Sequence, residues 1–457
     1  MLKVQHLANF KPWKDTGNIE LAPMTIFFGE NSSGKTSLLQ SLLLLKQTVE
    51  APSQEPLLLG GGGGKFLVEL GTAGTIFHKG ANNQDTLSLG IEWERPVDDG
   101  LQNIKWMSLL FKVEILFKNN TLSVKSLKYA NADNTSEFIE ALQIIGGKHD
   151  GKYELRTGLN IDFAVRRTAG QPWPLPRLIN CYSFPPELDR DYISSNVIRE
   201  IEYSFSNLVR SFRYIGPLRL WPSRTYTYAN IMPESVGDKG AEAVTMLVGE
   251  MNAQKFKPKA HKKNNKIKQI GDALKRLGVI TEFKIAPIGE VGRLYELKVQ
   301  VTRYSPLVSI VDVGFGVSQV LPTIVESVFA AEGSVILLEQ PEIHLHPKVQ
   351  ANLASVLLDF VKERGIQYII ESHSEHFLTR LQLEMATFDS EASNRVKIYF
   401  CEQVKGESKI RRLETDEFGY IKDWPEDFFG DVLGERMKMA DARADRIIDS
   451  RKGDLKV

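Results

Sequence analysis

Several features are scarce in this 457-residue sequence, and each scarcity excludes a class of protein. Cys181 and Cys401 are the only cysteines, too few for a disulfide framework or a four-thiolate zinc site. Basic and acidic residues number 57 each, so the net charge is zero and nucleic acid could bind only through a local patch. No run approaches the ~18 apolar residues that span a bilayer, and the start lacks a signal peptide's apolar region. We therefore expect a cytoplasmic protein with no membrane partner.

The composition that remains is that of an ordinary globular protein. Hydrophobic residues make up 42% and charged residues 25% of the chain, which argues against a disordered or fibrous protein. At ~150 residues per domain, the length suggests about three domain-sized units. Strand-like runs dominate the N-terminal third, and helical spacing mixed with short apolar runs follows. This order predicts an α/β fold.

The individual elements follow from local patterns. Strands are predicted at residues 3–10, 19–21, 24–28, 86–93, 107–117, 122–127, 159–165, 283–288 and 294–301. Helices are predicted at residues 35–46, 190–212 and 241–277, the last with a lysine-rich interruption. The short, wholly apolar runs 335–338 and 368–370 suit strands of a parallel sheet covered on both faces. Residues 441–457 are charged and predict a surface helix or a frayed tail.

A complete phosphate-binding motif, G-x-x-x-x-G-K-[ST], follows the third predicted strand and opens a helix. Its residues are Gly29, Glu30, Asn31, Ser32, Ser33, Gly34, Lys35 and Thr36, with Ser37 next to them. Glycines let backbone N–H groups converge on phosphate oxygens, and the helix N-terminus adds a favourable partial charge. Lys35 would bridge the β- and γ-phosphates, and the Thr36 hydroxyl would bind Mg²⁺. The motif predicts ATP and Mg²⁺ as cofactors; an ordinary glycine-serine turn is the alternative.

The acidic residue that such a loop needs lies far along the chain. Glu339 directly follows the apolar run 335–338, about 300 residues after Thr36. Its carboxylate would help to hold the Mg²⁺ shell. That separation is too long for one compact α/β unit, so we expect a large insertion between the two halves of the site.

The surrounding residues carry a resemblance to a known class. Residues 339–347, Glu-Gln-Pro-Glu-Ile-His-Leu-His-Pro, resemble the Walker B and D-loop segment of ABC-type ATPases of the SMC, RecF and OLD class. Residues 312–319, which include Gly316 and Ser318, resemble its signature, and residues 370–373 resemble the strand that carries its switch histidine, here His373. The resemblance implies an ABC-type P-loop ATPase head that dimerises head to tail across two ATP molecules.

This resemblance also implies a domain order. We expect an N-terminal ATPase lobe with the P-loop and a β-rich part at residues 1–166, and a mostly helical insertion at 167–300. A C-terminal ATPase lobe with signature, Walker B acid and switch histidine would occupy 301–430, and a charged tail 431–457.

The catalytic residues implied by the resemblance are Glu339, Gln340, Glu342 and His373. Gln340 departs from the class, in which this position is usually a glutamate that activates water. An amide cannot accept a proton as a general base, although it can orient a water molecule. Glu342 is the nearest alternative carboxylate, so the base stays open between these two. We expect slow hydrolysis.

Ser318 precedes an apolar helical stretch, and Pro322 is tolerated only near a helix's first turn, so the helix should begin close to Ser318. A glycine-rich turn that opens a helix is an anion site. Gly316 and Ser318 would complete the γ-phosphate shell of a nucleotide held by a second subunit. The alternative is that Gly314 and Gly316 only form a tight turn.

Two other clusters have competing interpretations. His344, His346, His373 and His376 could hold zinc, or the first two could be structural members of a subunit-contacting loop. The basic stretch from Lys255 to Lys268, with Lys275 and Arg276 beyond it, could contact duplex DNA or could be a solvated loop. It contains almost no aromatic residue for stacking on bases.

A second resemblance concerns biological role. Residues 214–219, with Pro222, Arg224 and Tyr226, and residues 416–419 and 424–429 resemble a prokaryotic family of RecF/OLD-like ATPases of anti-phage defence operons. The Septu and PARIS ATPase subunits are similar in plan, whereas residues 51–180 and 241–300 carry none of the resemblance. Arg219 and Arg224 could reach phosphates or a partner subunit, or form structural ion pairs.

The functional expectation is an ATPase subunit of a defence complex, a homodimer or higher oligomer that controls a separate effector, a nuclease. Unlike in OLD nucleases, we expect no nuclease domain after residue 430. DNA or a phage protein is the candidate trigger. One alternative is a DNA-repair or DNA-clamping head, although long coiled-coil heptads are missing. The other is an ATP-dependent scaffold with negligible turnover, which Gln340 favours.

Overall fold

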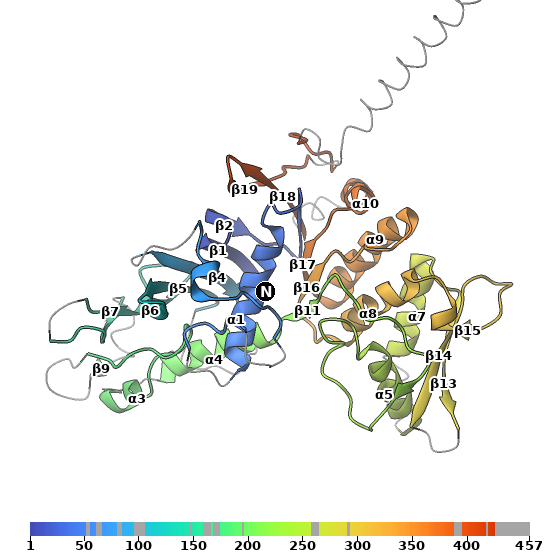
Figure 1. Ribbon diagram of the computed structural model, residues 1–457, viewed down its shortest axis with the longest axis horizontal. Helices are drawn as coiled ribbons and strands as arrows, with labels where there is room; N and C mark the ends of the chain where they lie inside the picture. The colour runs from blue at the N-terminus through green and yellow to red at the C-terminus, as the bar shows by residue number, and fades with distance from the viewer. Residues whose placement is uncertain are drawn as a thin grey trace, which may run out of the picture.

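Two large sheets, one antiparallel and one mostly parallel, organise the chain in this computed structural model (Figure 1). The structure describes residues 1–425 except 52–54, 61–65, 80–84, 96–105, 146–147, 159–165, 168–173, 194–195, 257–264, 290–292, 388–394 and 417–418. The predicted strand 159–165, the tail 441–457 and the middle of the lysine-rich stretch therefore lie outside the described residues.

The antiparallel sheet forms the N-terminal lobe. Its seven strands run in the order β2-β1-β4-β5-β6-β7-β8. They are β1 (Leu2–Phe10), β2 (Trp13–Glu20), β4 (Thr86–Glu94), β5 (Ser108–Lys118), β6 (Thr121–Asn131), β7 (Phe138–Gln143) and β8 (Tyr153–Thr157). Along β5, buried and half-buried side chains alternate, as expected when one face of a sheet packs on a core. The prediction of a β-rich N-terminal part is confirmed.

The second sheet contains the predicted parallel strands. Its order is β11-β16-β17-β3-β18-β19, and only β19 is antiparallel to its neighbour. The strands are β3 (Met24–Gly29), β11 (Arg213–Ile215), β16 (Val335–Glu339), β17 (Gln367–Glu371), β18 (Val396–Val404) and β19 (Glu407–Arg412). Because β3, β16 and β17 are parallel, their carboxyl ends meet at one edge of the sheet.

Helices cover both faces of the parallel sheet (Figure 1). One face packs against α1 (Lys35–Glu50), α4 (Asn196–Arg210) and the antiparallel sheet, and the other against α8 (Gly316–Phe329), α9 (Pro347–Arg364) and α10 (Glu375–Thr387). In β16, Val335 and Leu337 join the first core, whereas Ile336 and Leu338 join the second. This double burial explains why the strand is apolar at every position except its last.

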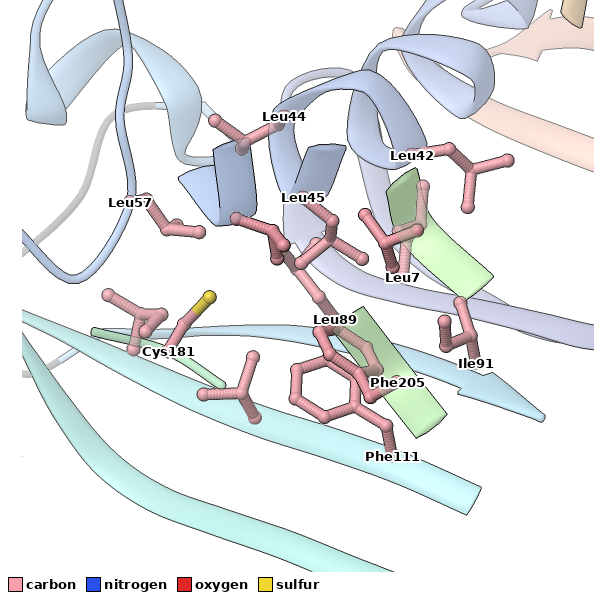
Figure 2. Close-up of a cluster of buried hydrophobic side chains, with 14 of the residues drawn as sticks. Leu7, Leu42, Leu44, Leu45, Leu57, Leu89, Ile91, Phe111, Cys181 and Phe205 are labelled. Carbon is pink, nitrogen blue, oxygen red and sulfur yellow. The ribbon is translucent and has the colours of Figure 1, made fainter. Parts of the chain in front are cut away.

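The first core brings α1 onto the antiparallel sheet. Leu42 and Leu45 of α1 lie over Leu89 and Phe111 of that sheet, with Phe205 of α4 beside them (Figure 2). The Phe111 and Phe205 rings are 4.3 Å apart. The helix that follows the P-loop is therefore fixed by a large apolar contact.

Residues 167–300 are mixed rather than mostly helical, which corrects the sequence-based interpretation. They include α3 (Glu187–Asp191), α4, α5 (Ala243–Phe256) and α7 (Lys266–Leu277), but also β11 and most of a small sheet. That sheet contains β12 (Tyr226–Thr227), β13 (Glu282–Ile288), β14 (Leu294–Gln300) and β15 (Val308–Ser309). β11 has only three residues and takes its hydrogen bonds from β16, so local spacing could not reveal it.

The remaining elements are short. β9 (Arg166–Arg167) pairs with β10 (Tyr192–Ile193), α2 spans Ala73–Ile76, and the 3₁₀ turn η1 spans Ile310–Asp312. In the described part of the chain, no helix is both long enough and apolar enough to cross a membrane.

Candidate nucleotide-binding site

The P-loop leaves β3 through a passage that only glycine can occupy. Gly29 has a φ of 140°, and a Cβ atom there would lie 1.9 Å from the carbonyl oxygen of Cys401 on β18. Gly34 has a φ of 98°, and a Cβ atom there would lie 2.9 Å from the Pro12 ring. Both residues need a left-handed or otherwise restricted backbone that side chains disfavour. Steric contacts therefore explain why the motif has glycine at both positions.

Side chains outside the motif hold the loop. Trp13 Nε1 donates a hydrogen bond to the carbonyl of Gly34 at 3.1 Å. Gln403 Nε2 donates to the carbonyl of Ser32 at 2.9 Å. The two donors come from β2 and β18, so the loop is supported from both sheets before any ligand arrives.

Lys35 lies inside the loop that it follows. Its side chain is only 3% exposed, and Nζ donates to the carbonyl oxygens of Gly29 at 3.0 Å and Glu30 at 2.5 Å. Burial lowers the pKa of Lys35, and the nearby Glu371 carboxylate opposes this shift. A phosphate group could replace the loop carbonyls as partner of the ammonium group, because it offers negatively charged oxygens.

Two carboxylates stand side by side at the edge of the sheet. Glu339 ends β16 and pairs in register with Glu371, which ends β17. Tyr214 Oη donates to Glu339 Oε1 at 3.0 Å, and Thr36 Oγ1 donates to Glu371 Oε1 at 3.0 Å. Burial, followed by the neighbouring Glu371, raises the pKa of Glu339 to about 7, and burial also raises the pKa of Glu371.

This donor set fits Mg²⁺. A hydroxyl and two carboxylates are the hard oxygen ligands that Mg²⁺ prefers. In addition, Glu371 Oε2 is buried without a hydrogen-bond partner among the described residues. A buried carboxylate oxygen of this kind is stabilised by a cation.

Glu342 is committed to a neighbouring loop. It is 6% exposed, and its Oε1 accepts hydrogen bonds from Ser372 Oγ at 2.8 Å and from the backbone N–H of His373 at 2.7 Å. Burial raises the pKa of Glu342. This carboxyl group therefore ties the loop after β16 to the loop after β17.

Gln340 and His373 flank that connection. Gln340 has a φ of 44°, and its backbone N–H donates to the Glu371 carbonyl at 2.8 Å. Burial, and then the positive charge of Lys35, lower the pKa of His373 to about 4. His373 is therefore neutral at physiological pH and can donate one hydrogen bond while accepting another.

The predicted signature lies on the N-terminal turn of α8, which begins at Gly316. Ser318 Oγ donates to the carbonyl of Phe315 at 2.7 Å. Pro322 lies in the second turn, so the helix starts earlier than the proline suggests. The Phe315 ring packs between Trp221 at 4.3 Å and His344 at 5.3 Å. In a single chain, the signature thus contacts the loop after β16.

The two predicted arginines act differently from one another. Arg219 is buried, and its Nη1 donates to the carbonyls of Gln319 at 2.8 Å and Pro341 at 3.4 Å. It therefore joins the signature helix to the Walker B loop. Arg224 forms an exposed two-pronged ion pair with Asp312, at 2.6 and 2.9 Å.

Structural partners account for two of the candidate zinc histidines. His344 stacks edge-on against Phe315, and His346 Nδ1 accepts a hydrogen bond from the Lys348 N–H at the start of α9. In the described part of the chain, no three His, Cys, Asp or Glu side chains gather closely enough to hold a metal ion.

The structure brings together Lys35, Thr36, Glu339, Glu342 and His373 from three separate stretches of sequence. It adds Glu371 and Tyr214, which sequence reasoning had not placed in the site. Glu371 had two signals in the sequence: it is an acid at the end of an apolar run, the pattern that identified Glu339, and it lies in the segment that resembles the switch-histidine strand. The signal for Tyr214 was its place in residues 214–219, which carry the second resemblance but no role for this residue.

Two family models match parts of the chain. Residues 200–378 match a model described as an AAA ATPase domain, a range that includes the signature, Glu339 and His373 but not the P-loop. Residues 392–439 match a model described as a protein of unknown function (DUF3696). The curated proteins contain no match to this chain.

Solved structures of SMC heads are similar in fold over most of the chain. An SMC head bound to the C-terminal winged-helix domain of ScpA is 12% identical, with a TM-score of 0.46, covering 91% of this chain and 98% of that one. The SMC head domain of Thermotoga maritima is 11% identical, with a TM-score of 0.40 and coverages of 91% and 99%.

An SMC head with an extended coiled coil, bound to the C-terminal domain of ScpA from Pyrococcus furiosus, is 12% identical. Its TM-score is 0.45, and the coverages are 97% and 99%.

Proposed function

We propose that this chain is an ATPase subunit that binds ATP and Mg²⁺ at the edge of its parallel sheet. One observation carries the proposal: the Thr36 hydroxyl and the Glu339 and Glu371 carboxylates gather beside the buried Lys35 ammonium group. The partial match to an AAA ATPase domain supports the same activity. The complete P-loop motif supplies the third line of support.

Each residue has a role in this proposal. The N–H groups of the P-loop cradle the phosphates, and Lys35 neutralises two of them. Thr36 and Glu339 hold Mg²⁺, which, when bound, would neutralise charge that develops on the phosphate oxygens. Neutral His373 donates a hydrogen bond to the terminal phosphate.

Gln340 is the residue that orients the attacking water in this proposal. Glu342 is the less suitable candidate, because it is buried and its Oε1 accepts two hydrogen bonds that hold the His373 loop, although its Oε2 has no hydrogen-bond partner among the described residues. Since an amide cannot take the proton, hydrolysis is slow. A scaffold with negligible turnover remains the second candidate, favoured by Gln340.

The assembly we propose is a head-to-tail dimer across two nucleotides. Gly314 is exposed and Gly316 half-exposed at the start of α8, so backbone N–H groups there can approach a nucleotide held by another copy. Ser318 itself is 7% exposed, and its hydroxyl is bonded to Phe315, so the contact runs through the turn.

The biological output we propose is control of a separate effector nuclease in an anti-phage complex. Its support is the resemblance of residues 214–219 and their companions to defence ATPases. A duplex-DNA contact from Lys255 to Lys268 belongs to the same proposal. A DNA-repair clamp is the rival role.

The test of ATP binding is calorimetry on Lys35→Ala, with Lys284→Ala, an exposed lysine of β13, as the control. We expect Lys35→Ala to lose measurable ATP binding, because the site loses the cation that faces two phosphates. Lys284→Ala should bind like the wild type. Equal affinity in wild type and Lys35→Ala would contradict the proposal.

A further inference from the structure

We propose that Glu371 is a second acidic residue of the cation site: it accepts a hydrogen bond from the Thr36 hydroxyl and adds a carboxylate beside Glu339. The inference rests on the proposed ATP site and deepens it. It concerns a residue outside both the P-loop and the Walker B segment.

The position of β17 puts Glu371 between the two recognised halves of the site. β17 pairs with β16 on one side and with the P-loop strand β3 on the other. In register, Glu371 lies opposite Glu339 on β16 and opposite Phe27 on β3. The P-loop and the Walker B acid are not on adjacent strands, so a side chain at the end of β17 is the one that bridges them.

The direction of one hydrogen bond indicates what Glu371 does. A hydroxyl that binds a cation through an oxygen lone pair must give its proton to another acceptor. Thr36 Oγ1 donates to Glu371 Oε1 at 3.0 Å. The hydrogen bond therefore orients the Thr36 hydroxyl so that its oxygen lone pairs are available to a cation. Residues that hydrogen-bond to metal ligands commonly orient them in this way.

The second carboxylate oxygen of Glu371, Oε2, would be stabilised by a nearby positive charge. Glu371 is 4% exposed, and its Oε2 is buried without a hydrogen-bond partner among the described residues. The positive charge of Lys35 acts on the Glu371 carboxyl group, but Lys35 Nζ already donates to the carbonyls of Gly29 and Glu30. A divalent cation beside the two carboxylates would compensate both, whereas a triphosphate without a cation would be repelled by them.

The rival explanation is that Glu371 only fixes the Thr36 rotamer. Glu371→Gln separates the two, because the amide keeps an acceptor oxygen for Thr36 and removes the negative charge. Glu375→Gln is a matched control, since Glu375 is an exposed acid four residues later on α10. Both variants remove one charge from the same short segment.

The experiment measures the affinity for a non-hydrolysable ATP analogue by calorimetry, with Mg²⁺ and with EDTA. We expect Glu371→Gln to lower the Mg²⁺ preference at least tenfold, through weaker binding with Mg²⁺ and tighter binding in EDTA. Electron paramagnetic resonance of Mn²⁺ should also find less bound Mn²⁺ in the complex. Glu375→Gln should match the wild type in every measurement.

An unchanged metal preference in Glu371→Gln would overturn the inference, while the ATP site would stand. Absence of analogue binding by the wild type would instead remove the proposed function. Thermal unfolding without ligand checks the fold of the variant. If Glu371→Gln does not fold, Glu371→Asp replaces it, because aspartate keeps the charge but is shorter by one methylene. A smaller loss of the Mg²⁺ preference then supports the inference, and an unchanged Mg²⁺ preference overturns it.

Discussion

Glu339 and His373 lie at the same sheet edge and have opposite pKa shifts with one cause. Burial favours the neutral form of each, so the pKa of Glu339 rises to about 7 and that of His373 falls to about 4. For Glu339, the folded state holds the extra proton between about pH 4.5 and 7, so stability falls as pH rises through that window. For His373, the unfolded state holds it between about pH 4 and 6.5, so stability rises. In the wild type the two effects largely cancel.

Single substitutions should therefore expose each effect. Glu339→Gln keeps an acceptor for Tyr214 but no longer titrates. Between pH 4 and pH 8, its free energy of unfolding should therefore rise by about 3 kcal/mol more than that of the wild type. His373→Gln should remove the opposing rise between pH 4 and 6.5. Urea unfolding from pH 4 to 8, without nucleotide, measures both. Profiles parallel to that of the wild type would mean that these groups are not buried as described.

The residue after the Walker B acid governs the expected rate. Gln340→Glu places a carboxylate where an amide stands and should raise steady-state ATP turnover by on the order of tenfold or more, since a carboxylate can accept the proton of water. Phosphate release measures it. If Glu342→Gln abolishes turnover and Gln340→Glu leaves it unchanged, Glu342 is the base instead. A rapid wild-type rate would refute slow hydrolysis.

How well single residues could be predicted depended on whether their partners were local. Lys35 and Thr36 belong to a contiguous motif, and Glu339 ends an apolar run, so the sequence was enough to select them. Glu371 and Tyr214 matter because register on β17 and β11 places them beside partners 335 and 125 residues away. No window of sequence contains that information.

At the level of elements, α8 is where the structure refines the sequence most. The helix was predicted to begin close to Ser318 and begins at Gly316, whereas its packing through Phe315 was not predicted. Strands 335–338 and 368–370 were predicted because burial on both faces leaves a wholly apolar run in the sequence. β11 was missed because three residues carry no periodicity. The insertion as a whole was interpreted as mostly helical although its predicted strands 283–288 and 294–301 are present as β13 and β14.

The turn that opens α8 makes a prediction about assembly. ATP with Mg²⁺ should increase self-association, and Ser318→Arg should reduce this gain several-fold, since a long side chain would block the turn from the opposite nucleotide. Light scattering with and without ATP measures the mass. Glu332→Arg, exposed just beyond the far end of α8, is the control. A mass independent of nucleotide in all three proteins would argue against the nucleotide sandwich.

At the level of the whole molecule, the proposed output runs through a second protein. A partner can respond to ATP only if it binds one nucleotide state better than another. We therefore expect the isolated chain to cut neither DNA nor RNA, while co-expression with the product of a neighbouring gene gives a stable complex that restricts phage. Metal-dependent cleavage by the purified chain that persists in Lys35→Ala but is lost on mutating Glu342 or His344 would contradict this.

The place of β3 in the parallel sheet has a consequence for protein synthesis. Both strands that flank β3, β17 and β18, are made after residue 366, so the P-loop strand has no ladder partner while most of the chain is still being translated. Thr36 meets Glu371 only after 335 further residues have been added, which takes on the order of tens of seconds at about 5–20 residues per second. A transcript or ribosome that stops early leaves a fragment without a nucleotide site. The proposed nucleotide site is therefore complete only after synthesis has passed residue 371.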